Sequence, residues 1–479
     1  MYKKILAAVV CAASVLSLAG CGEKNTNSGS TNNGGNSGST NSGNTNSGDT
    51  NSGDTNSGDT NTPEKKDPVL VDTGYTVGDE DKTLTICVWN DEWQGFFQKY
   101  YKVPDGVTVK WVTNTNDGGV YQTKLDGYLA DGGKEDDGTQ VDLFLAEADY
   151  IKKYVLSDYT ADLKALGVDT SQMYKYTVDA GTDGSGTLKA ASFQACPNVL
   201  IYRRSIAKEV LGTDDPAEVQ SKLDSWDKFN SVAASAKEKG YYMTPSALET
   251  YRIFANNSDK AFLDSSDTFQ VPDAFNTWLA QAEEFMDKGY TIGCGVWDAE
   301  KTTEMGANGK TMCFFGPSWY YNFCMGDAHD QAMGDWAVCV GPQEAFWGGT
   351  WMLIPETADS KGLAADVIKA FTTNEDLLKQ LIEIDTQYGN KKDLMKKYSE
   401  DASYGNEFLG GQNDIAIMYN VAEGIKWDNN LHTIYDQTFN EKLPEQMLEY
   451  LNGATSKDDA WNNFYKTLQE AAPSVKIPD

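Results

Sequence analysis

Apolar and polar residues alternate along three short stretches in the first third of the chain, with helical spacing between them. The stretch KTLTICVWND at 82–91 alternates in this way, and GVTVKWV at 106–112 and QVDLFLAEADY at 140–150 have the same β-strand character. Between them, EWQGFFQKYY at 92–101 and VYQTKLDGYLADGG at 120–133 carry apolar residues at helical spacing. This alternation predicts an α/β lobe with a largely parallel sheet.

The ends of these predicted strands are the first candidates for a binding site. In open α/β sheets, ligands bind beyond the carboxyl ends of the strands. Residues 89–93 follow the first strand, and residues 145–150 end the third. We therefore expect both segments to lie on one rim of the sheet.

A second set of elements follows. PNVLIYRRSI at 197–206 predicts a strand, and DPAEVQSKLDSW at 215–226 predicts a helix that begins after Asp215. GKTMCFFGPSWYYNF at 309–323 predicts a strand, a Gly-Pro turn and a helix that starts near Ser318. Later segments such as 362–371 are amphipathic without accompanying strands, so the C-terminal third is expected to be mostly helical.

The N-terminal residues are typical of an exported lipoprotein. Two lysines precede a short apolar run, which predicts a signal peptide at 1–20 and is too short for a membrane-spanning helix. The run ends in Leu-Ala-Gly-Cys, which resembles a bacterial lipobox and implies a lipidated Cys21. A plain signal peptide with an incidental cysteine is the alternative. Two acyl chains on Cys21 would hold the protein stably on the outer face of the cytoplasmic membrane, as on a Gram-positive cell surface.

Residues 21–80 are expected to be the lipidated cysteine followed by a tether. Residues 25–62 are almost wholly Asn, Ser, Gly, Thr and Asp, and they repeat NSGDT. Such a segment cannot bury enough apolar surface to fold. With about 40 flexible residues, its root-mean-square reach is roughly 35 Å.

Length and charge limit the function of the remaining body. About 400 residues exceed the roughly 250 to 300 at which a single core stops growing, so two lobes are expected. The net charge of −31 argues against nucleic acid or an anionic lipid surface as a partner.

Cysteine and histidine usage argues against metal or cofactor chemistry. Beyond Cys21, no pair of cysteines has CxxC spacing, and neither His329 nor His432 sits in a metal-binding pattern. Histidine-based catalysis is therefore not expected. Disulfides among the four cysteines between 294 and 339 and free buried cysteines are both left open.

Five phrases in a fixed order resemble a known family: VWND, VDLFLAEADYIKKYV, PNVLIYRRSIAKEVLG, FFGPSWY and FWGGTWMLIP. They resemble the extracellular solute-binding lipoproteins of bacterial ATP-binding-cassette (ABC) importers, in the carbohydrate group that includes maltose-binding protein. The resemblance covers about 82–470. It implies a two-lobed, periplasmic-binding-protein-like fold, with a first lobe at 82–194 and 350–408 and a second at 197–345 and 412–479. Ligand in the interlobe cleft would drive closure about the hinge crossovers.

A sugar-binding site requires flat aromatic side chains, or plates, against the CH faces of the sugar and planar polar groups that bind its hydroxyl groups. Trp319 matches the family's Gly-Pro-Trp stretch, in which the indole stacks on a sugar ring; a tryptophan that caps the core is the alternative. Tyr320 is an equally balanced candidate. The family's loop after the first strand supplies carboxylates, and this implies a binding role for Trp89, Asp91, Glu92 and Trp93.

Several other residues are placed near the cleft by the same resemblance. Glu147 and Asp149 match the loop after the third strand, although the aromatic residue that the family often has there is absent. Gln194 lies near the first predicted crossover. Tyr251 and Arg252 lie where the second lobe should return to the cleft, and a structural ion pair is an equal alternative for the arginine. Further plates are possible at two positions, Trp297 and Trp427.

The stretch FWGGTWMLIP carries two tryptophans with different expected roles. Strand alternation places Trp351 in the core, while Trp347 precedes the strand at the second crossover and is the predicted sugar plate. Gly348 and Gly349 have no side chains, so a ligand or the opposite lobe can approach their backbone, or they act as a hinge.

The resemblance implies a monomeric, non-enzymatic protein that captures a carbohydrate, with several aromatic residues favouring an oligosaccharide, and delivers it to an ABC permease. A lipid-anchored glycoside hydrolase is one alternative. However, Glu147 and Asp149 are too close in one loop to flank a bond from opposite faces. A non-catalytic surface adhesin that binds glycans is the other.

Overall fold

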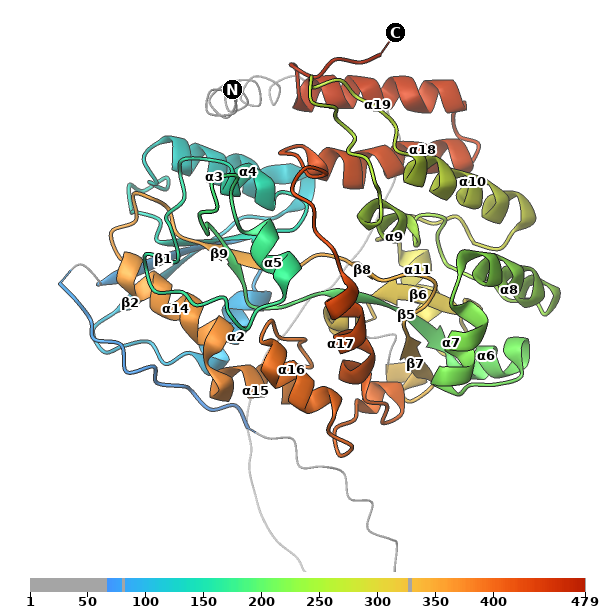
Figure 1. The fold of residues 1–479 in the computed structure, drawn as a ribbon, viewed down its shortest axis with the longest axis horizontal. Coiled ribbons are helices and arrows are strands. Elements are labelled where there is room, and N and C mark those ends of the chain that lie inside the picture. The colour runs from blue at the N-terminus through green and yellow to red at the C-terminus, as the bar shows by residue number, and fades with distance from the viewer. Residues whose placement is uncertain (1–66, 80–81, 326–329, 479) are drawn as a thin grey trace, which may run out of the picture.

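The computed structural model describes residues 67–79, 82–325 and 330–478. The predicted signal peptide at 1–20, Cys21 and most of the tether lie outside the described residues. Within the described part, no helix combines the length and apolarity that a membrane span requires. The strands form two separate sheets, which lie side by side with helices around them (Figure 1). We call the parts built on these sheets the first and the second lobe.

The first lobe contains a five-stranded sheet with the order β2-β1-β3-β9-β4. Its strands are β1 (Thr83–Val88), β2 (Thr108–Thr113), β3 (Leu143–Glu147), β4 (Ala191–Ser192) and β9 (Thr350–Leu353). β1 is parallel to β2 and β3, as predicted, but β9 is antiparallel to both β3 and β4. β1, β2, β3 and β4 therefore share one direction and β9 alone runs the other way, which agrees with the predicted, largely parallel sheet. β9 enters from the second lobe at the opposite end of the sheet, so it runs against its neighbours.

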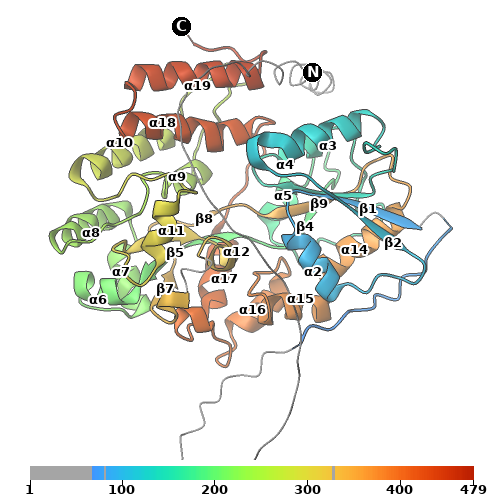
Figure 2. The same cartoon turned by 180° about the vertical axis from the view of Figure 1, so that it is seen from behind.

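Helices cover both faces of this sheet, with α3 and α4 on one side and α2 and α14 on the other (Figures 1 and 2). Apolar residues from the sheet and the helices form one core, in which Ile86, Phe144, Met352 and Phe371 are completely buried. The helices are α2 (Glu92–Tyr100), α3 (Val120–Ala130), α4 (Ile151–Val155), α5 (Lys175–Ala180), α14 (Lys361–Thr373), α15 (Glu375–Glu383) and α16 (Lys392–Ser399), with the 3₁₀ turn η2 (Asp117–Gly119). The 3₁₀ turn η4 (Glu407–Leu409) packs against the second lobe, where the carbonyl oxygen of Phe408 accepts the amide of Gly334 at 3.1 Å.

The second lobe is organised around β5 (Pro197–Arg203), which is antiparallel to every strand that it pairs with. Its neighbours are β6 (Cys313–Gly316), β7 (Trp336–Cys339) and, at the start of β5, the short β8 (Ala345–Phe346). The surrounding helices are α6 (Arg204–Leu211), α7 (Pro216–Leu223), α8 (Trp226–Glu238), α9 (Tyr251–Asn256), α10 (Asp273–Lys288), α11 (Ala299–Met305) and α12 (Ser318–Phe323), with the 3₁₀ turn η3 (Asp330–Ala332). Asp215 caps α7 through the amides of Ala217 and Glu218, as its position before Pro216 predicts.

The C-terminal part of the chain is helical, which confirms the prediction. It comprises α17 (Asp414–Gly424), the π-helical turn η5 (Thr438–Lys442), α18 (Leu443–Leu451) and α19 (Lys457–Ala471). α17 packs against β5 and α16, while α18 packs against α19 and α10. The second group forms an apolar core of its own, around Trp278, Phe439 and Phe464.

The chain connects the two sheets between β4 and β5 and again between β8 and β9. At the first crossover the backbone of Gln194 bridges to Gly389, and its side-chain amide donates to Thr350 Oγ1 at 3.4 Å. At the second, Gly348 and Gly349 have φ values of 71° and 117°, in the region that other residues rarely adopt. The two crossovers therefore lie close together, between the sheets. The lobe boundaries expected from the sequence stay a prediction.

Trp351 lies in the core, as strand alternation predicts. It is 1% exposed, and its Nε1 donates to the carbonyl oxygen of Thr177 at 2.9 Å. We expect Trp351→Ala to lower the free energy of unfolding by about 3–5 kcal/mol, through lost burial and a residual cavity. Denaturant unfolding measures this. Trp347→Ala is the matched control, because the half-buried Trp347 should contribute less, and equal losses would contradict the assignment.

Candidate ligand-binding site

Helix α12 presents two aromatic residues at the interface between the lobes. It begins directly after β6 and Pro317, and Trp319 and Phe323 lie one turn apart on the same side. Trp319 is half-buried and Phe323 is 60% exposed. A Cβ atom at Gly316 would lie 2.3 Å from the Tyr320 ring, so only glycine allows the helix to start so close to the strand.

The second crossover lies against this helix. Trp319 Nε1 donates to the carbonyl oxygen of Trp347 at 3.3 Å. A Cβ atom at Gly348 would be 3.4 Å from the Trp319 ring and 3.6 Å from Glu147 Oε1. These are ordinary contact distances, so the indole of Trp319 and the carboxyl group of Glu147 both lie beside the crossover, while the φ of 71° is what favours glycine at position 348.

Four aromatic rings form what we call the aromatic platform: Trp297, Trp319, Phe323 and Trp347. The ring centroids are 5.2 Å apart for Trp319 and Trp347, 5.8 Å for Trp297 and Trp347, and 6.4 Å for Trp297 and Phe323. Trp297 is 66% exposed. Large exposed aromatic side chains that gather in one place mark binding surfaces. The platform therefore brings Trp319 and Trp347, both predicted sugar plates, together with Trp297.

A buried ion pair lies under the platform. Lys301 Nζ is 2.8 Å from Glu249 Oε2, and the two side chains are only 3% and 2% exposed. The same ammonium group lies 5.2 Å from the centroid of Tyr320 and 5.9 Å from that of Trp347. Glu249 Oε1 also accepts the backbone amide of Phe315 at 3.0 Å. This pair joins α11 to the strand and the rings that it supports.

A second ion pair connects the two lobes directly. Arg252, on α9, donates both terminal nitrogens to the two carboxylate oxygens of Asp149, at 2.5 and 2.6 Å. Asn440 Nδ2 donates to Asp149 Oδ1 at 2.8 Å, and the Arg252 guanidinium group lies 5.9 Å from the Trp347 ring centroid. We call Asp149, Arg252 and Asn440 the interlobe latch. Arg252 therefore forms a structural ion pair with Asp149, which is the alternative to a ligand-binding role for this arginine.

More acidic than basic side chains lie at and around the latch. Burial, and next the charge of Asp149, raise the pKa of Glu147 well above its ordinary value. The same two causes raise the pKa of Glu441 to about 7, although Arg252 opposes the shift. Glu147 Oε2 accepts the amide of Asp149 at 2.8 Å. Near neutral pH, part of this cluster is therefore protonated and can donate as well as accept hydrogen bonds.

Glu92 is the first residue of α2 in the first lobe. Its side chain is exposed, yet loss of solvation, followed by the charges of Asp385 and Asp91, raises its pKa to about 6. Burial chiefly raises the pKa of the thiols of Cys196 and Cys324, and the charge of Glu92 adds to both shifts. The charge of Glu92 therefore acts on both the first crossover and the end of α12.

Three of the predicted site residues are core residues instead. Trp93 is 3% exposed and packs against Phe371 with a centroid distance of 5.0 Å. Tyr251 is 2% exposed, and its hydroxyl group donates to the carbonyl oxygen of Phe439 at 2.6 Å. Tyr320 is completely buried behind Trp319. These predictions are corrected because each side chain points from its helix into the core rather than toward the cleft.

The remaining predicted residues take intermediate positions. Trp89 is half-buried and lies edge-on to Tyr121 and Tyr150, with centroids 5.7 and 6.4 Å away, so the two predicted rim segments do meet. Asp91 is exposed at the start of α2. Trp427 is not an open plate, because its ring stacks on His432 at a centroid distance of 3.5 Å.

Sequence reasoning missed Phe323, Lys301, Glu249, the latch residue Asn440 and the neighbouring Glu441. Phe323 had a usable signal, because it follows Trp319 by four residues in a predicted helix and so shares its face. The charged residues had none, since their partners are distant in the sequence. Among the described residues, no group of His, Cys, Asp and Glu could hold a metal ion, and the six cysteines from Cys87 to Cys339 are free thiols.

The fold is that of a two-lobed protein, and its candidate site lies by the crossovers. The model of the bacterial extracellular solute-binding protein family matches residues 96–406, and the chain belongs to this family. It is thus a binding protein and not an enzyme. No curated protein matches the chain.

Solved structures show the same fold at low sequence identity. An extracellular solute-binding protein of family 1 aligns with a TM-score of 0.66 and 19% identity, over 82% of this chain and all of the other. A binding protein from B. animalis subsp. lactis Bl-04, in complex with β-1,6-galactobiose, gives 0.63 and 13%, over 83% and 100%. The sugar-binding protein MalE of Xanthomonas citri gives 0.60 and 14%, over 81% and 97%. The expected two-lobed α/β fold is confirmed.

The ion pair under the platform should matter for stability. We expect Lys301→Met to lower the free energy of unfolding by about 3–5 kcal/mol, because Glu249 would be left as a buried charge without a partner. The double variant Lys301→Met/Glu249→Gln should recover most of this loss. Denaturant unfolding measures both. Equal losses in the single and double variants would show that packing of the lysine stem dominates, and Lys288→Met in the exposed pair with Glu284 is the control.

The acid cluster should make stability fall with rising pH. The folded state keeps a proton on Glu441 up to about pH 7, whereas the unfolded chain releases it near the ordinary value of 4.5. Between these values, stability therefore falls as pH rises. Glu441→Gln should remove this term, so its gain in stability over the native chain should grow from about pH 5 to about pH 8. Glu445→Gln, one turn later, should show no such trend, and a pH-independent difference would contradict the assignment.

Proposed function

We propose that this protein captures a carbohydrate on the aromatic platform, between its two lobes. The observation that carries the proposal is the platform itself: four rings, two of them largely exposed, gathered beside the second crossover. Indole and phenyl faces suit the CH patches of sugar rings. Ligand-binding roles for Trp319, Trp347 and Trp297 follow, with Phe323 added.

Polar groups beside the platform suit the hydroxyl groups of a sugar. Glu147 and Trp319 both lie beside Gly348, and the charge of Glu92, in the first lobe, acts on Cys324 at the end of α12. Carboxyl groups with a raised pKa can accept or donate hydrogen bonds, as hydroxyl groups require. Asp149 and Arg252 bind each other, so we expect them to affect ligand binding only by holding the two lobes together.

The extent of the platform favours an oligosaccharide over a single sugar. Trp297 and Phe323 are more than half exposed and lie outside the half-buried pair Trp319 and Trp347. The inner pair alone offers enough area for one ring. The outer pair would then hold a further ring of the same ligand.

Family membership supports a role in import. Members are extracellular solute-binding proteins, and the similar structures include complexes with β-1,6-galactobiose and, in the Listeria monocytogenes protein Lmo0181, with cycloalternan. We infer that this chain delivers its ligand to an ABC permease, as a monomer. The predicted lipidation of Cys21 would anchor it to the outer face of the cytoplasmic membrane, on the tether at 21–80.

The glycoside hydrolase alternative is disfavoured by the latch as well as by the family. Hydrolysis needs two free carboxyl groups on either side of the scissile bond. Asp149 instead gives both oxygens to Arg252.

The sharpest test removes the central ring of the platform. Trp319→Ala should weaken oligosaccharide binding by more than about 1 kcal/mol, which is roughly fivefold or more in Kd, because a well-packed anchor is lost. Trp347→Ala should act in the same direction. Trp319→Phe is the matched control, since it keeps a ring but no N–H group, and it should retain most of the affinity. Calorimetry against malto-, xylo- and manno-oligosaccharides measures each effect.

Two results would contradict the proposal. Unchanged affinity in Trp319→Ala, with an intact fold by thermal unfolding, would make Trp319 a structural residue. A monosaccharide that binds better than every oligosaccharide in the panel would refute the extended site. Retention on insoluble polysaccharide without binding of any soluble sugar would indicate an adhesin.

A further inference from the structure

A second hollow lies by the crossovers, away from the aromatic platform. It has a volume of about 230 Å³ and is formed by the end of α9, the segment before β8 and the residues after α17. Figure 1 shows α17 in front, whereas α11 and α12, which carry the platform, are in front in the opposite view of Figure 2. The hollow and the platform therefore lie on different faces of the molecule.

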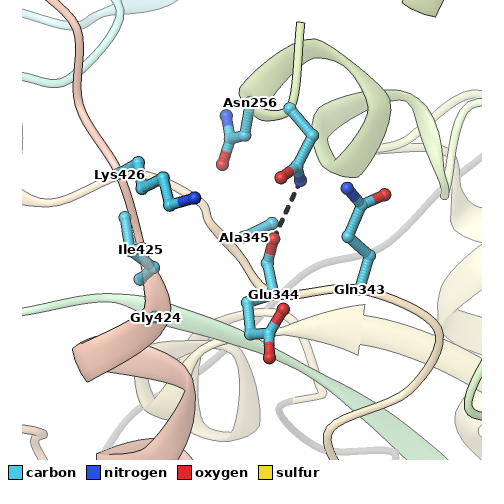
Figure 3. Close-up of a pocket in the computed structure, with 8 residues that line it drawn as sticks. Asn256, Gln343, Glu344, Ala345, Gly424, Ile425 and Lys426 are labelled. Carbon is cyan, nitrogen blue, oxygen red and sulfur yellow. Dashed lines mark hydrogen bonds between the residues drawn. The ribbon is translucent and has the colours of Figure 1, made fainter.

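Three amide side chains in the hollow are held by one end each. Asn256 Oδ1 accepts the backbone amide of Phe346 at 2.6 Å, and Gln343 Oε1 accepts Trp226 Nε1 at 3.1 Å. Asn257 Nδ2 donates to the carbonyl oxygen of Glu344 at 2.8 Å, the dashed line in Figure 3. These bonds fix the amides and leave the NH₂ groups of Asn256 and Gln343 and the Oδ1 atom of Asn257 available.

The hollow also contains one cation and one anion that are not paired with each other. Lys426 and Glu344 both line it, and across the described part of the chain neither takes part in an ion pair within 4 Å. In Figure 3, the ammonium group of Lys426 and the amide of Gln343 extend into the hollow from opposite sides, with Glu344 below them. Gly424 keeps this side open, because a Cβ atom there would lie 3.3 Å from Glu344 Cγ.

We propose that this hollow is a second binding site and that it takes a small zwitterion of the amino-acid class. The ligand's carboxylate would accept from Lys426 and from the NH₂ groups of Asn256 and Gln343. Its ammonium group would donate to Glu344 and to Asn257 Oδ1. A ligand with a single charge would leave either Lys426 or Glu344 unmatched, which weakens binding.

The size of the hollow fits this class. At about 30 Å³ for each water molecule, 230 Å³ corresponds to roughly seven or eight waters. It is smaller than the roughly 300–1,000 Å³ of pockets for drug-sized ligands. An oligosaccharide does not fit, whereas a molecule of about six non-hydrogen atoms does.

The site is connected to the platform through α9. Asn256 stands at the last position of this helix, and Arg252 of the interlobe latch is in its first turn. Asn256 also holds the amide of Phe346, the residue before Trp347. An occupant would therefore contact the helix that carries the latch and the strand that leads to the platform, without contacting the sugar site.

The test uses saturation-transfer NMR on the full chain with L-alanine and glycine as probes. Acetate, methylammonium and glycerol are the matched probes with one charge or none. We expect both zwitterions to saturate with a Kd of about 1 mM or lower, and the other three to bind at least about tenfold more weakly. Lys426→Met and Glu344→Gln should each weaken the zwitterions about tenfold. Both side chains are exposed, so the fold should be retained.

Controls on α19 separate a site from general charge effects. Lys466→Met and Glu470→Gln change the same charges on exposed positions far from the hollow and should leave zwitterion binding unchanged. The proposal is overturned if neither zwitterion saturates, if glycerol binds as tightly as glycine, or if the α19 variants lose binding to the same extent. Loss of zwitterion binding in Trp319→Ala would place the ligand on the platform and would also overturn it. Because oligosaccharide binding is measured separately, failure here leaves the proposed function untouched.

Discussion

The bidentate ion pair between Asp149 and Arg252 is the interaction on which the arrangement of the two lobes depends. It joins the loop after β3 in the first lobe to α9 in the second, with both side chains largely buried. A buried charge pair contributes to stability only when its geometry is close to ideal and further hydrogen bonds complete it. Asn440 supplies such a bond from a third segment. Three distant parts of the chain therefore meet at one carboxyl group.

The same interaction sets the chemistry of the site. Burial and the charge of Asp149 raise the pKa of both Glu147 and Glu441, and Arg252, which is paired with Asp149, opposes these shifts only in part, so the two glutamates are held toward their protonated forms. Arg252 also lies beside the ring of Trp347. The latch thus determines where the platform stands and which hydrogen bonds its neighbouring acids can make. A carboxyl group that both accepts and donates matches a sugar hydroxyl group better than a fixed anion does.

The sequence contains the elements of the site but not their pairing. Strand ends, the helix after Pro317 and the glycines before β9 follow from local patterns, and they predict that Trp319 lies in the first turns of a helix, Glu147 at a strand end and Trp347 before β9, where the structure has them. The predicted binding role of Tyr320 is wrong because adjacent helical residues point about 100° apart, so only one of Trp319 and Tyr320 can face the cleft. The predicted binding role of Trp93 is wrong because its ring packs against Phe371, which lies on a helix of the C-terminal half and is too distant in the sequence for a local pattern to reveal. The latch pairs residues 103 positions apart, and no local pattern encodes that contact.

The two tryptophans of FWGGTWMLIP show how a crossover becomes part of a binding site. Trp351 lies within β9 and is fixed by its bond to Thr177, while Trp347 lies outside the strand because Gly348 and Gly349 leave the extended conformation. The carbonyl oxygen of Trp347 in turn holds the indole of Trp319. In the proposed site, rotation of one lobe about these glycines would change the spacing between the platform and the first-lobe acids Glu92 and Glu147. Ligand contact and lobe closure would then be coupled by geometry, since the crossover backbone would itself be one wall of the site.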